Sequence, residues 1–203
     1  MTEINGITAI ILAAGSSTRM GQPKLLLPWR DNTILGEVTS TLVKAGIQEI
    51  IIVIQPKQNL LKSHIQQLSI DKPLRIVLNE SFDSEDMLSS IRYGLKAIKP
   101  SYEAALITLG DQPQIQENVV RDICSCYFQS KAPIIIPSYH MQRGHPWLIS
   151  RPLWSTLIQL EQPSTPQDFL KQHQKDIHYI LVDNPSILQD IDTPQDYKKH
   201  KPL

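Results

Sequence analysis

The sequence contains little cysteine. Its 203 residues include only two cysteines, Cys124 and Cys126, and a single residue separates them. They fall on an expected helix, where side chains two positions apart point in different directions. We therefore expect neither a structural disulfide nor a zinc site.

Long hydrophobic segments are also lacking. The apolar runs at 7–14 and 50–54 are far shorter than the roughly 20 residues that a membrane-spanning helix needs. The N-terminus has no basic region, and its apolar run leads into a loop with glycine and serine instead of a cleavage site. We therefore expect a cytoplasmic protein that does not interact with membranes.

No charge of one sign predominates. Twenty Lys and Arg residues balance twenty Asp and Glu residues, so the formal net charge is +0. This balance leaves no overall field that attracts nucleic acid or anionic lipid. No basic stripe with stacking aromatic residues is present either, and we expect no nucleic-acid partner. An anion must therefore be bound by a local site.

Short β-branched runs alternate with segments of helical periodicity, which predicts a mainly parallel, doubly wound α/β sheet. The length and the hydrophobic content of 41% favour one domain over residues 1–203. The second half is interrupted by prolines, and the runs around Tyr139 could pair as a hairpin. The expected strands cover 7–12, 49–54, 74–78, 104–109, 133–137, 146–149 and 177–182, and the expected helical faces are Ile34, Val38, Leu42 and Val43; Leu60, Leu61, Ile65 and Leu68; and Met87, Ile91, Leu95 and Ile98.

A loop suited to polyphosphate follows the first expected strand. Its glycines and small residues let a ligand approach the backbone, and Arg19 and Lys24 supply positive charge. The spacing is neither that of a Walker A loop nor that of a dinucleotide fingerprint. The alternative is a surface loop with two solvated cations. The expected nucleotide contacts in this loop are Leu12, Ala13, Ala14, Gly15, Ser16, Ser17, Arg19, Gly21 and Lys24.

Two acidic segments follow at greater distance along the chain. Asp111 ends the fourth expected strand, just before Pro113, which we expect to open the next helix. Its carboxylate could hold Mg²⁺ beside bound phosphates or could cap that helix. Near the C-terminus, Asp192 could be a second metal ligand, or it could serve with Thr193 as a helix cap. Asp190 is the weaker metal candidate.

The segment from Leu12 to Pro28 resembles the signature of the molybdenum cofactor cytidylyltransferase family, within the wider group of molybdopterin guanylyltransferases. Guanylyl members tend to have a second glycine near Gly15, so the resemblance favours CTP. It extends from Ile10 to Tyr197. It implies a Rossmann-like fold of the nucleotide-diphospho-sugar transferase type, with an NTP-binding half up to about residue 113 and an acceptor-binding half over about 114–203.

The resemblance also implies roles for three further groups of residues. Asn79, Ser89 and Ser90 match the segment that contacts the base and ribose, with helix capping as the alternative for the serines. An Arg-Gly-His-Pro segment faces the acceptor in the family, and here it contains Arg143, Gly144 and His145. Structural roles for Arg143 and His145 remain an alternative.

The sequence departs from the family pattern at two places. Asp86 stands where a glycine is expected, and the segment 161–170 lacks an arginine that binds the acceptor in many cytidylyl members. For this reason the acceptor is less well indicated than the reaction.

The expected activity is Mg²⁺-dependent transfer of a cytidylyl group from CTP to a phosphorylated acceptor, with release of pyrophosphate. Arg19, Lys24 and Asp111 would be catalytic, and Asp111 and Asp192 would bind the metal. The resemblance implies molybdopterin as the acceptor and a molybdoenzyme or its chaperone as a protein partner. Another NTP, a sugar phosphate acceptor, Mn²⁺ instead of Mg²⁺, and a non-catalytic nucleotide-binding regulator all remain open.

Overall fold

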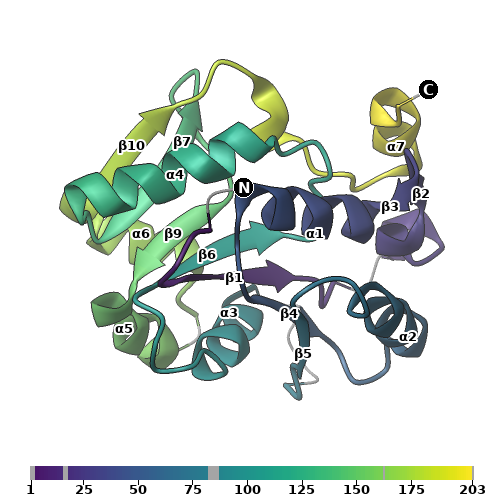
Figure 1. The fold of residues 1–203 in the computed structure, drawn as a ribbon, viewed down its shortest axis with the longest axis horizontal. Coiled ribbons are helices and arrows are strands. Elements are labelled where there is room, and N and C mark those ends of the chain that lie inside the picture. Colours follow the sequence, from purple (N-terminus) through teal and green to yellow (C-terminus); the bar gives the residue numbers. More distant parts are fainter. Residues whose placement is uncertain (1–2, 16–17, 82–86, 162, 203) are drawn as a thin grey trace.

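A single large sheet runs through the protein (Figure 1). The structure is a computed structural model and describes residues 3–15, 18–81, 87–161 and 163–202. The strands lie side by side in the order β10-β7-β9-β6-β1-β4-β5, and β8 pairs with β7. Their bounds are β1 Ile7–Leu12, β4 Ile50–Ile54, β5 Leu74–Leu78, β6 Ala104–Leu109, β7 Ile134–Tyr139, β8 Gln142–Arg143, β9 Trp147–Ser150 and β10 Ile177–Leu181.

The sheet is mainly parallel, as the sequence predicts. β1 pairs in parallel with β4 and β6, β4 with β5, and β7 with β10, whereas β9 runs antiparallel to β6 and β7. The expected hairpin around Tyr139 is confirmed, because Ile134 pairs with Ile149 across β7 and β9. The carboxyl ends of β1, β4 and β6 therefore meet at one edge of the sheet, where α/β folds bind ligands.

Helices alternate with strands in the first half, in the expected order. Local signals fix their ends: the Thr33 hydroxyl accepts from Gly36 N–H at the start of α1, and Gly46 ends that helix with φ 105°. The bounds are α1 Ile34–Ala45, α2 Asn59–Leu68, α3 Met87–Lys96, α4 Glu117–Ser130, α5 Trp154–Gln159, α6 Pro166–Gln172 and α7 Pro194–His200, with a small β2–β3 hairpin at Pro28–Trp29 and Asn32–Thr33.

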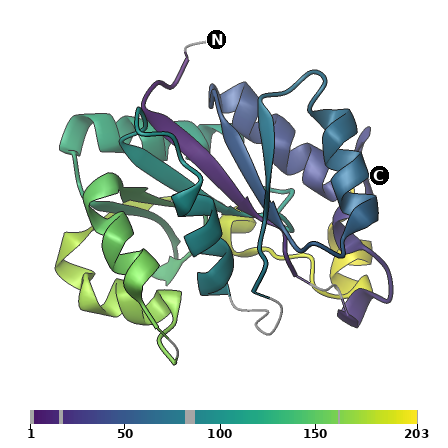
Figure 2. The same cartoon turned by 90° about the horizontal axis from the view of Figure 1, so that it is seen from below.

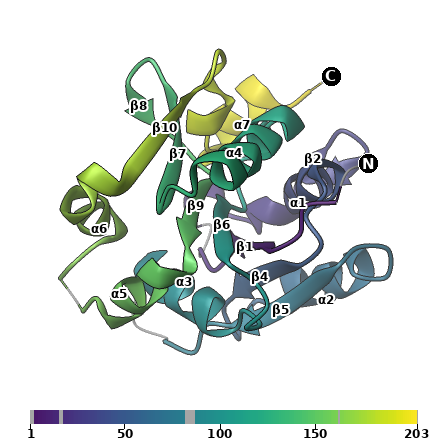
Figure 3. The ribbon, with the colours of Figure 1, turned by 60° about the vertical axis from the view of Figure 1, so that its left-hand side comes forward.

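Both faces of the sheet are covered, which explains the near-continuous apolar runs of its strands. In β1, Ile11 packs in the core cluster that also contains residues of α1 and α4, and Ile10 packs in the cluster of α3, α5 and α6. Figure 3 shows α1 and α4 on one side of the sheet and α3 and α5 on the other. This arrangement confirms the doubly wound fold.

Two sequence expectations are wrong in detail. Leu60 was expected on the buried face of α2 but is 69% exposed, while Leu61 and Ile65 are buried. Pro113 does not open a helix, because α4 begins only at Glu117, with Gln116 as its N-cap. In the described part of the chain, every helix is too short or too polar to cross a membrane.

Candidate active site

A cavity of about 160 Å³ lies where β1 and β6 end. The loop after β1 forms one wall, Lys24 and Asp111 supply charged groups, and α3 closes another side. Ser16 and Ser17 of the expected loop contacts, and Asp86, lie outside the described residues. The lining residues are Leu12, Ala13, Ala14, Gly15, Lys24, Leu25, Met87, Ser90, Leu109 and Asp111.

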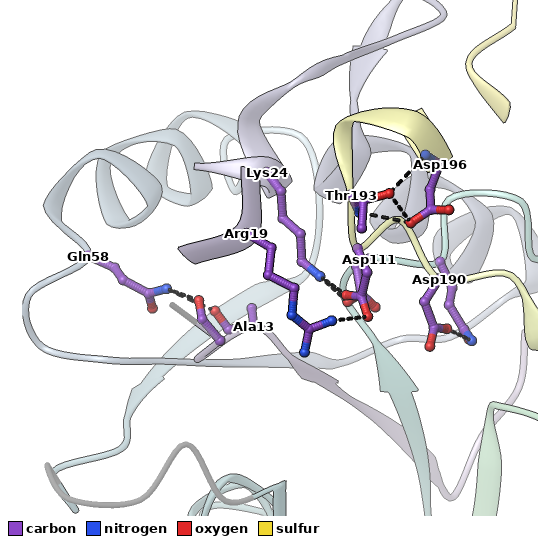
Figure 4. Close-up of polar contacts among 11 residues, drawn as sticks. Ala13, Arg19, Lys24, Gln58, Asp111, Asp190, Thr193 and Asp196 are labelled. Atoms are coloured by element: carbon purple, nitrogen blue, oxygen red, sulfur yellow. Dashed lines mark hydrogen bonds and ion pairs between the residues drawn. The ribbon is translucent and has the colours of Figure 1, made fainter. Parts of the chain in front are cut away.

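Lys24 lies at the centre of the charged groups. Its Nζ is 2.6 Å from Oδ2 of Asp111 and 2.7 Å from Oδ1 of Asp192. Arg19 Nη1 lies 3.2 Å from the other oxygen of Asp192. Figure 4 shows Arg19 and Lys24 extending from the loop after β1 toward the same group of carboxylates. The structure thus brings together Arg19, Lys24, Asp111 and Asp192, the charged residues that the sequence assigned to catalysis and metal binding.

The ammonium of Lys24 stays charged in this setting. Burial alone would lower the pKa of Lys24, but the charges and hydrogen bonds of Asp111 and Asp192 outweigh burial, and the pKa is raised. A fixed positive charge therefore borders the cavity beside the loop that we expect to hold phosphates.

The C-terminal segment carries Asp192 to the site. Figure 2 shows this segment, in yellow, running along the end of the sheet toward α7. Ile191 N–H donates to the carbonyl of Asp111 at 3.0 Å. At the far end, the Tyr197 hydroxyl donates to the carbonyl of Pro28 at 2.6 Å. These contacts hold Asp192 near Lys24.

Thr193, and not Asp192, caps α7. The Thr193 hydroxyl accepts from Asp196 N–H, and the Asp196 carboxylate accepts from Thr193 N–H, which is a complete capping box. The Asp192 carboxylate is therefore left for Lys24 and Arg19. Asp111 likewise caps no helix, since Gln116 precedes α4.

Asp190 forms part of the same acidic group. Burial first, and then the negative charges of Asp111 and Asp192, raise the pKa of Asp190 to about 6. The side-chain amide of Gln112 donates to both Asp190 Oδ1 and the carbonyl of Ile187. Gln112 thereby ties the turn after β6 to the C-terminal segment.

The carboxylates of the site fit a hard divalent cation whose remaining coordination positions are filled by a bound ligand. Asp111 and Asp192 offer carboxylate oxygens to one cation, the ammonium of Lys24. Among the described residues, no group of three or more His, Cys, Asp or Glu side chains forms a ready metal cage. Mg²⁺ commonly binds through one or two carboxylates together with substrate phosphates. The two aspartates therefore suit a metal that arrives with a polyphosphate.

Asn79, Ser89 and Ser90 form one buried group between β5 and α3. The side-chain Nδ2 of Asn79 donates to Ser90 Oγ at 3.1 Å, and Ser89 Oγ donates to the side-chain Oδ1 of Asn79 at 3.0 Å. Neither serine caps α3, because both lie inside the helix. Ser90 lines the cavity. The group fixes α3 beside the site, and its role in base binding remains a prediction.

The Arg-Gly-His-Pro segment makes structural contacts. Arg143 Nε donates to the Tyr179 hydroxyl at 2.8 Å. A Cβ on Gly144 would lie 2.5 Å from the carbonyl oxygen of Ile187, so close packing requires glycine there. The His145 ring stacks on Trp147 at 4.5 Å. None of the three lines the cavity, and their acceptor role stays a prediction.

Burial also governs the charge state of His145. Its Nε2 is enclosed and has no hydrogen-bond partner among the described residues. Burial lowers the pKa of His145 to about 4, so the ring is neutral at pH 7. A neutral ring neutralises no phosphate charge, although it can still accept or donate one hydrogen bond.

Sequence reasoning missed Gln58, which contacts the loop after β1 from outside that loop. Its amide nitrogen donates to the carbonyls of Ala13 and Gly15 (Figure 4). A lone glutamine before an expected helix carries no sequence signal for such a role, because the contacts join residues more than forty positions apart.

Comparisons with known proteins identify the family of this chain. Residues 9–177 match the MobA-like NTP transferase domain family. The chain is 31% identical over 198 residues to the molybdenum cofactor cytidylyltransferase of Escherichia coli K12, covering 96% of this chain and 95% of the relative. It is 27% identical over 206 residues to the nicotine blue oxidoreductase of Paenarthrobacter nicotinovorans, covering 95% of each.

A solved structure is also similar. Rv0371c from Mycobacterium tuberculosis H37Rv superposes with a TM-score of 0.81 at 27% identity, over 97% of both chains. A manganese complex of that protein matches with a TM-score of 0.74 at 26% identity, over 96% of this chain and 97% of the other. Because the family match spans most of the sequence and the cytidylyltransferase relative exceeds 30% identity over nearly its whole length, the chain belongs to the MobA-like NTP transferase family and is a nucleotidyltransferase.

Proposed function

We propose that the protein transfers a cytidylyl group from CTP to a phosphorylated acceptor, with Mg²⁺ as the metal and pyrophosphate as the leaving group. The observation that carries this proposal is the shared contact of Lys24 with Asp111 and Asp192 at the mouth of the loop after β1. The Lys24 ammonium offers positive charge to phosphates, the two carboxylates offer oxygen ligands to a metal ion, and the small-residue loop lets the backbone approach the triphosphate.

The reaction is an in-line displacement at phosphorus. A phosphate oxygen of the acceptor forms a bond to the α-phosphorus of the NTP, while the bond from that phosphorus to the bridging oxygen breaks and the electron pair leaves with pyrophosphate. The loop and cavity position the triphosphate, and Lys24 and Arg19 stabilise negative charge as it moves onto the leaving group.

The proposed displacement requires no protein nucleophile. Cys124 is unsuited to such a role, because it is buried in α4 and burial raises the pKa of its thiol to about 12.

Asp111 and Asp192 would hold the metal ion. When bound, Mg²⁺ supplies charge neutralisation and polarisation of the phosphate oxygens. The manganese complex of Rv0371c supports a divalent cation in this fold. The preference for Mg²⁺ over Mn²⁺ is part of the proposal and is tested by comparing the two ions.

The nucleotide and the acceptor are supported less directly than the reaction. The similarity to the molybdenum cofactor cytidylyltransferase of E. coli K12 supports a cytidylyl donor, for which we propose CTP, and the molybdenum cofactor as acceptor. Within the segment that departs from the family pattern, Thr165 and Asp168 form a capping box that starts α6, and Lys171 pairs with Asp168. Because these side chains make contacts within α6, they do not indicate which acceptor binds, and the acceptor has to be established by experiment.

The decisive experiment is calorimetric titration of the purified protein with CTP, GTP, ATP and UTP in the presence of Mg²⁺. We expect selective binding of CTP, and weaker binding by the Asp111→Ala variant. Release of pyrophosphate should then require a phosphorylated acceptor, with molybdopterin and sugar phosphates compared directly.

Each other result would change the proposal in a defined way. Selective binding of a different NTP would contradict the cytidylyl assignment but keep the reaction class. Tight NTP binding without pyrophosphate release for any acceptor would indicate a nucleotide-binding regulator. No binding of any NTP would refute the proposal.

A further inference from the structure

Gln58 contacts the loop after β1 at two backbone carbonyls. Its Nε2 lies 3.2 Å from the carbonyl oxygen of Ala13 and 3.1 Å from that of Gly15. Its Oε1 accepts from the backbone N–H of Gln55 at 2.7 Å. Both ends of the amide are therefore engaged, and the orientation of the side chain is fixed.

The side chain of Gln58 does not serve the helix that it precedes. Gln58 is the N-cap residue of α2, but its side chain makes no capping hydrogen bond. A good N-cap side chain stabilises a helix by about 1 kcal/mol. The side chain instead satisfies the loop carbonyls, which indicates that the loop is what Gln58 stabilises.

The geometry of the peptide bond links this contact to the cavity. In a trans peptide, the carbonyl of one residue and the N–H of the next point in opposite directions. Because the Ala13 carbonyl points toward Gln58, the N–H of Ala14 points away from Gln58. Ala13, Ala14 and Gly15 line the cavity, whereas Gln58 does not, so Gln58 lies behind the loop.

We propose that Gln58 is a positioning residue for the triphosphate: it holds the Ala13 and Gly15 carbonyls away from the phosphates and so presents the Ala14 N–H to them. This inference rests on the proposed function for the identity of the anion. Unrestrained carbonyl oxygens near a phosphate would repel it, and an N–H directed at an anion is a strong donor.

The chemistry of the amide makes the role specific to glutamine. Gln58→Glu has nearly the same shape, but an ionised carboxylate cannot donate and would add negative charge beside both carbonyls. Gln58→Met is of similar length and removes the hydrogen bonds without adding charge. Gln55→Glu is the matched control, because it makes the same change of charge three residues earlier, where the contact to Gln58 uses the backbone.

The test measures the affinity for inorganic tripolyphosphate by calorimetry without metal, together with hydrogen exchange of the amides in residues 12–15. We expect about tenfold weaker binding in Gln58→Met, the loss of roughly one or two hydrogen bonds, and a larger loss in Gln58→Glu. Exchange should be faster in both variants and unchanged in Gln55→Glu. Binding of Mn²⁺ alone should be unaffected, which a general loss of structure would not allow.

Two results would overturn the role of Gln58. One is wild-type tripolyphosphate affinity in both Gln58 variants, and the other is unchanged exchange of residues 12–15. If Gln58→Glu does not fold, Gln58→Met alone decides. If the wild-type protein binds neither tripolyphosphate nor any NTP, the proposed function fails, and faster exchange in the variants would still support the restraint on the loop.

Discussion

The ammonium of Lys24 lies 2.6 Å from Oδ2 of Asp111, although 87 positions separate the two residues in the sequence. Both side chains are largely buried at the edge of the cavity. The contact joins the loop after β1 to the turn after β6, which are neighbouring strands of the sheet. A lysine and an aspartate in this relation form a charged centre that a metal-bound polyphosphate would rearrange.

Removal of either charged partner should greatly reduce turnover. We expect Lys24→Ala or Asp111→Ala to lower the rate of pyrophosphate release by at least about 100-fold, the scale of losing one group that stabilises transition-state charge. Lys62→Ala, on the exposed side of α2, is the control and should keep the wild-type rate. Wild-type turnover in either site variant would contradict the catalytic assignment.

Lys24 should also compete with the metal ion when no nucleotide is bound. Its ammonium contacts both carboxylates that would hold the metal. We expect Lys24→Met to bind Mn²⁺ alone several-fold more tightly, because opposite charges in partly buried pairs interact strongly, and to bind tripolyphosphate more weakly. Calorimetry with each probe measures the two effects.

Arg19→Met is the control for this competition. Arg19 also contacts Asp192, but its side chain is 73% exposed, and exposed pairs contribute little. Its effect on Mn²⁺ affinity should be smaller. Equal gains in the two variants would show a general charge effect and contradict direct competition by Lys24.

Substitution by alanine should affect ligand binding at Gly15 and stability at Gly144. A Cβ on Gly15 would meet nothing within 4 Å, so the fold does not require glycine there. We expect Gly15→Ala to keep the thermal stability and to bind NTP about tenfold more weakly or worse, because the methyl group enters the space where the backbone must approach the ligand.

Gly144→Ala should instead destabilise the fold. Its Cβ would lie 2.5 Å from the Ile187 carbonyl oxygen, and overpacking of this kind typically costs about 1–3 kcal/mol. Urea unfolding and NTP titration of the two variants distinguish the effects. A stability loss in Gly15→Ala larger than that in Gly144→Ala would contradict both assignments.

The enclosed imidazole of His145 should make the protein less stable in mild acid. Its pKa is lowered from 6.5 to about 4 in the folded state. Between these values the unfolded chain binds a proton that the folded state does not, so the free energy of unfolding falls as the pH decreases. At pH 5 the expected loss is up to about 2 kcal/mol.

Urea unfolding at pH 7 and pH 5 tests this prediction against His145→Gln. The raised pKa of Asp190 acts in the opposite direction, because the folded state takes up a proton there first, and it is common to both proteins. The acid-induced loss should be smaller in His145→Gln. An equal loss in both proteins would show that His145 is not responsible.

The sequence alone determined the layered fold and much of the charged site. β-branched runs and helical periodicity are local. They predicted the succession of strands β1, β4, β5 and β6 along the chain, with a helix between each strand and the next. Arg19, Lys24 and Asp111 were found because each follows a strand, and the carboxyl ends of parallel strands meet at one edge.

Only the tertiary structure decided the rest, because it depended on contacts between distant parts of the chain. Asp192 or Thr193 could each start α7 by local rules, and only the folded chain brings Asp192 to Lys24, 168 positions earlier in the sequence. The position of Gln58 behind the loop had no local signal at all. Sequence periodicity shows which face of an element is buried, whereas the partner that each polar group finds is fixed only when the chain has folded.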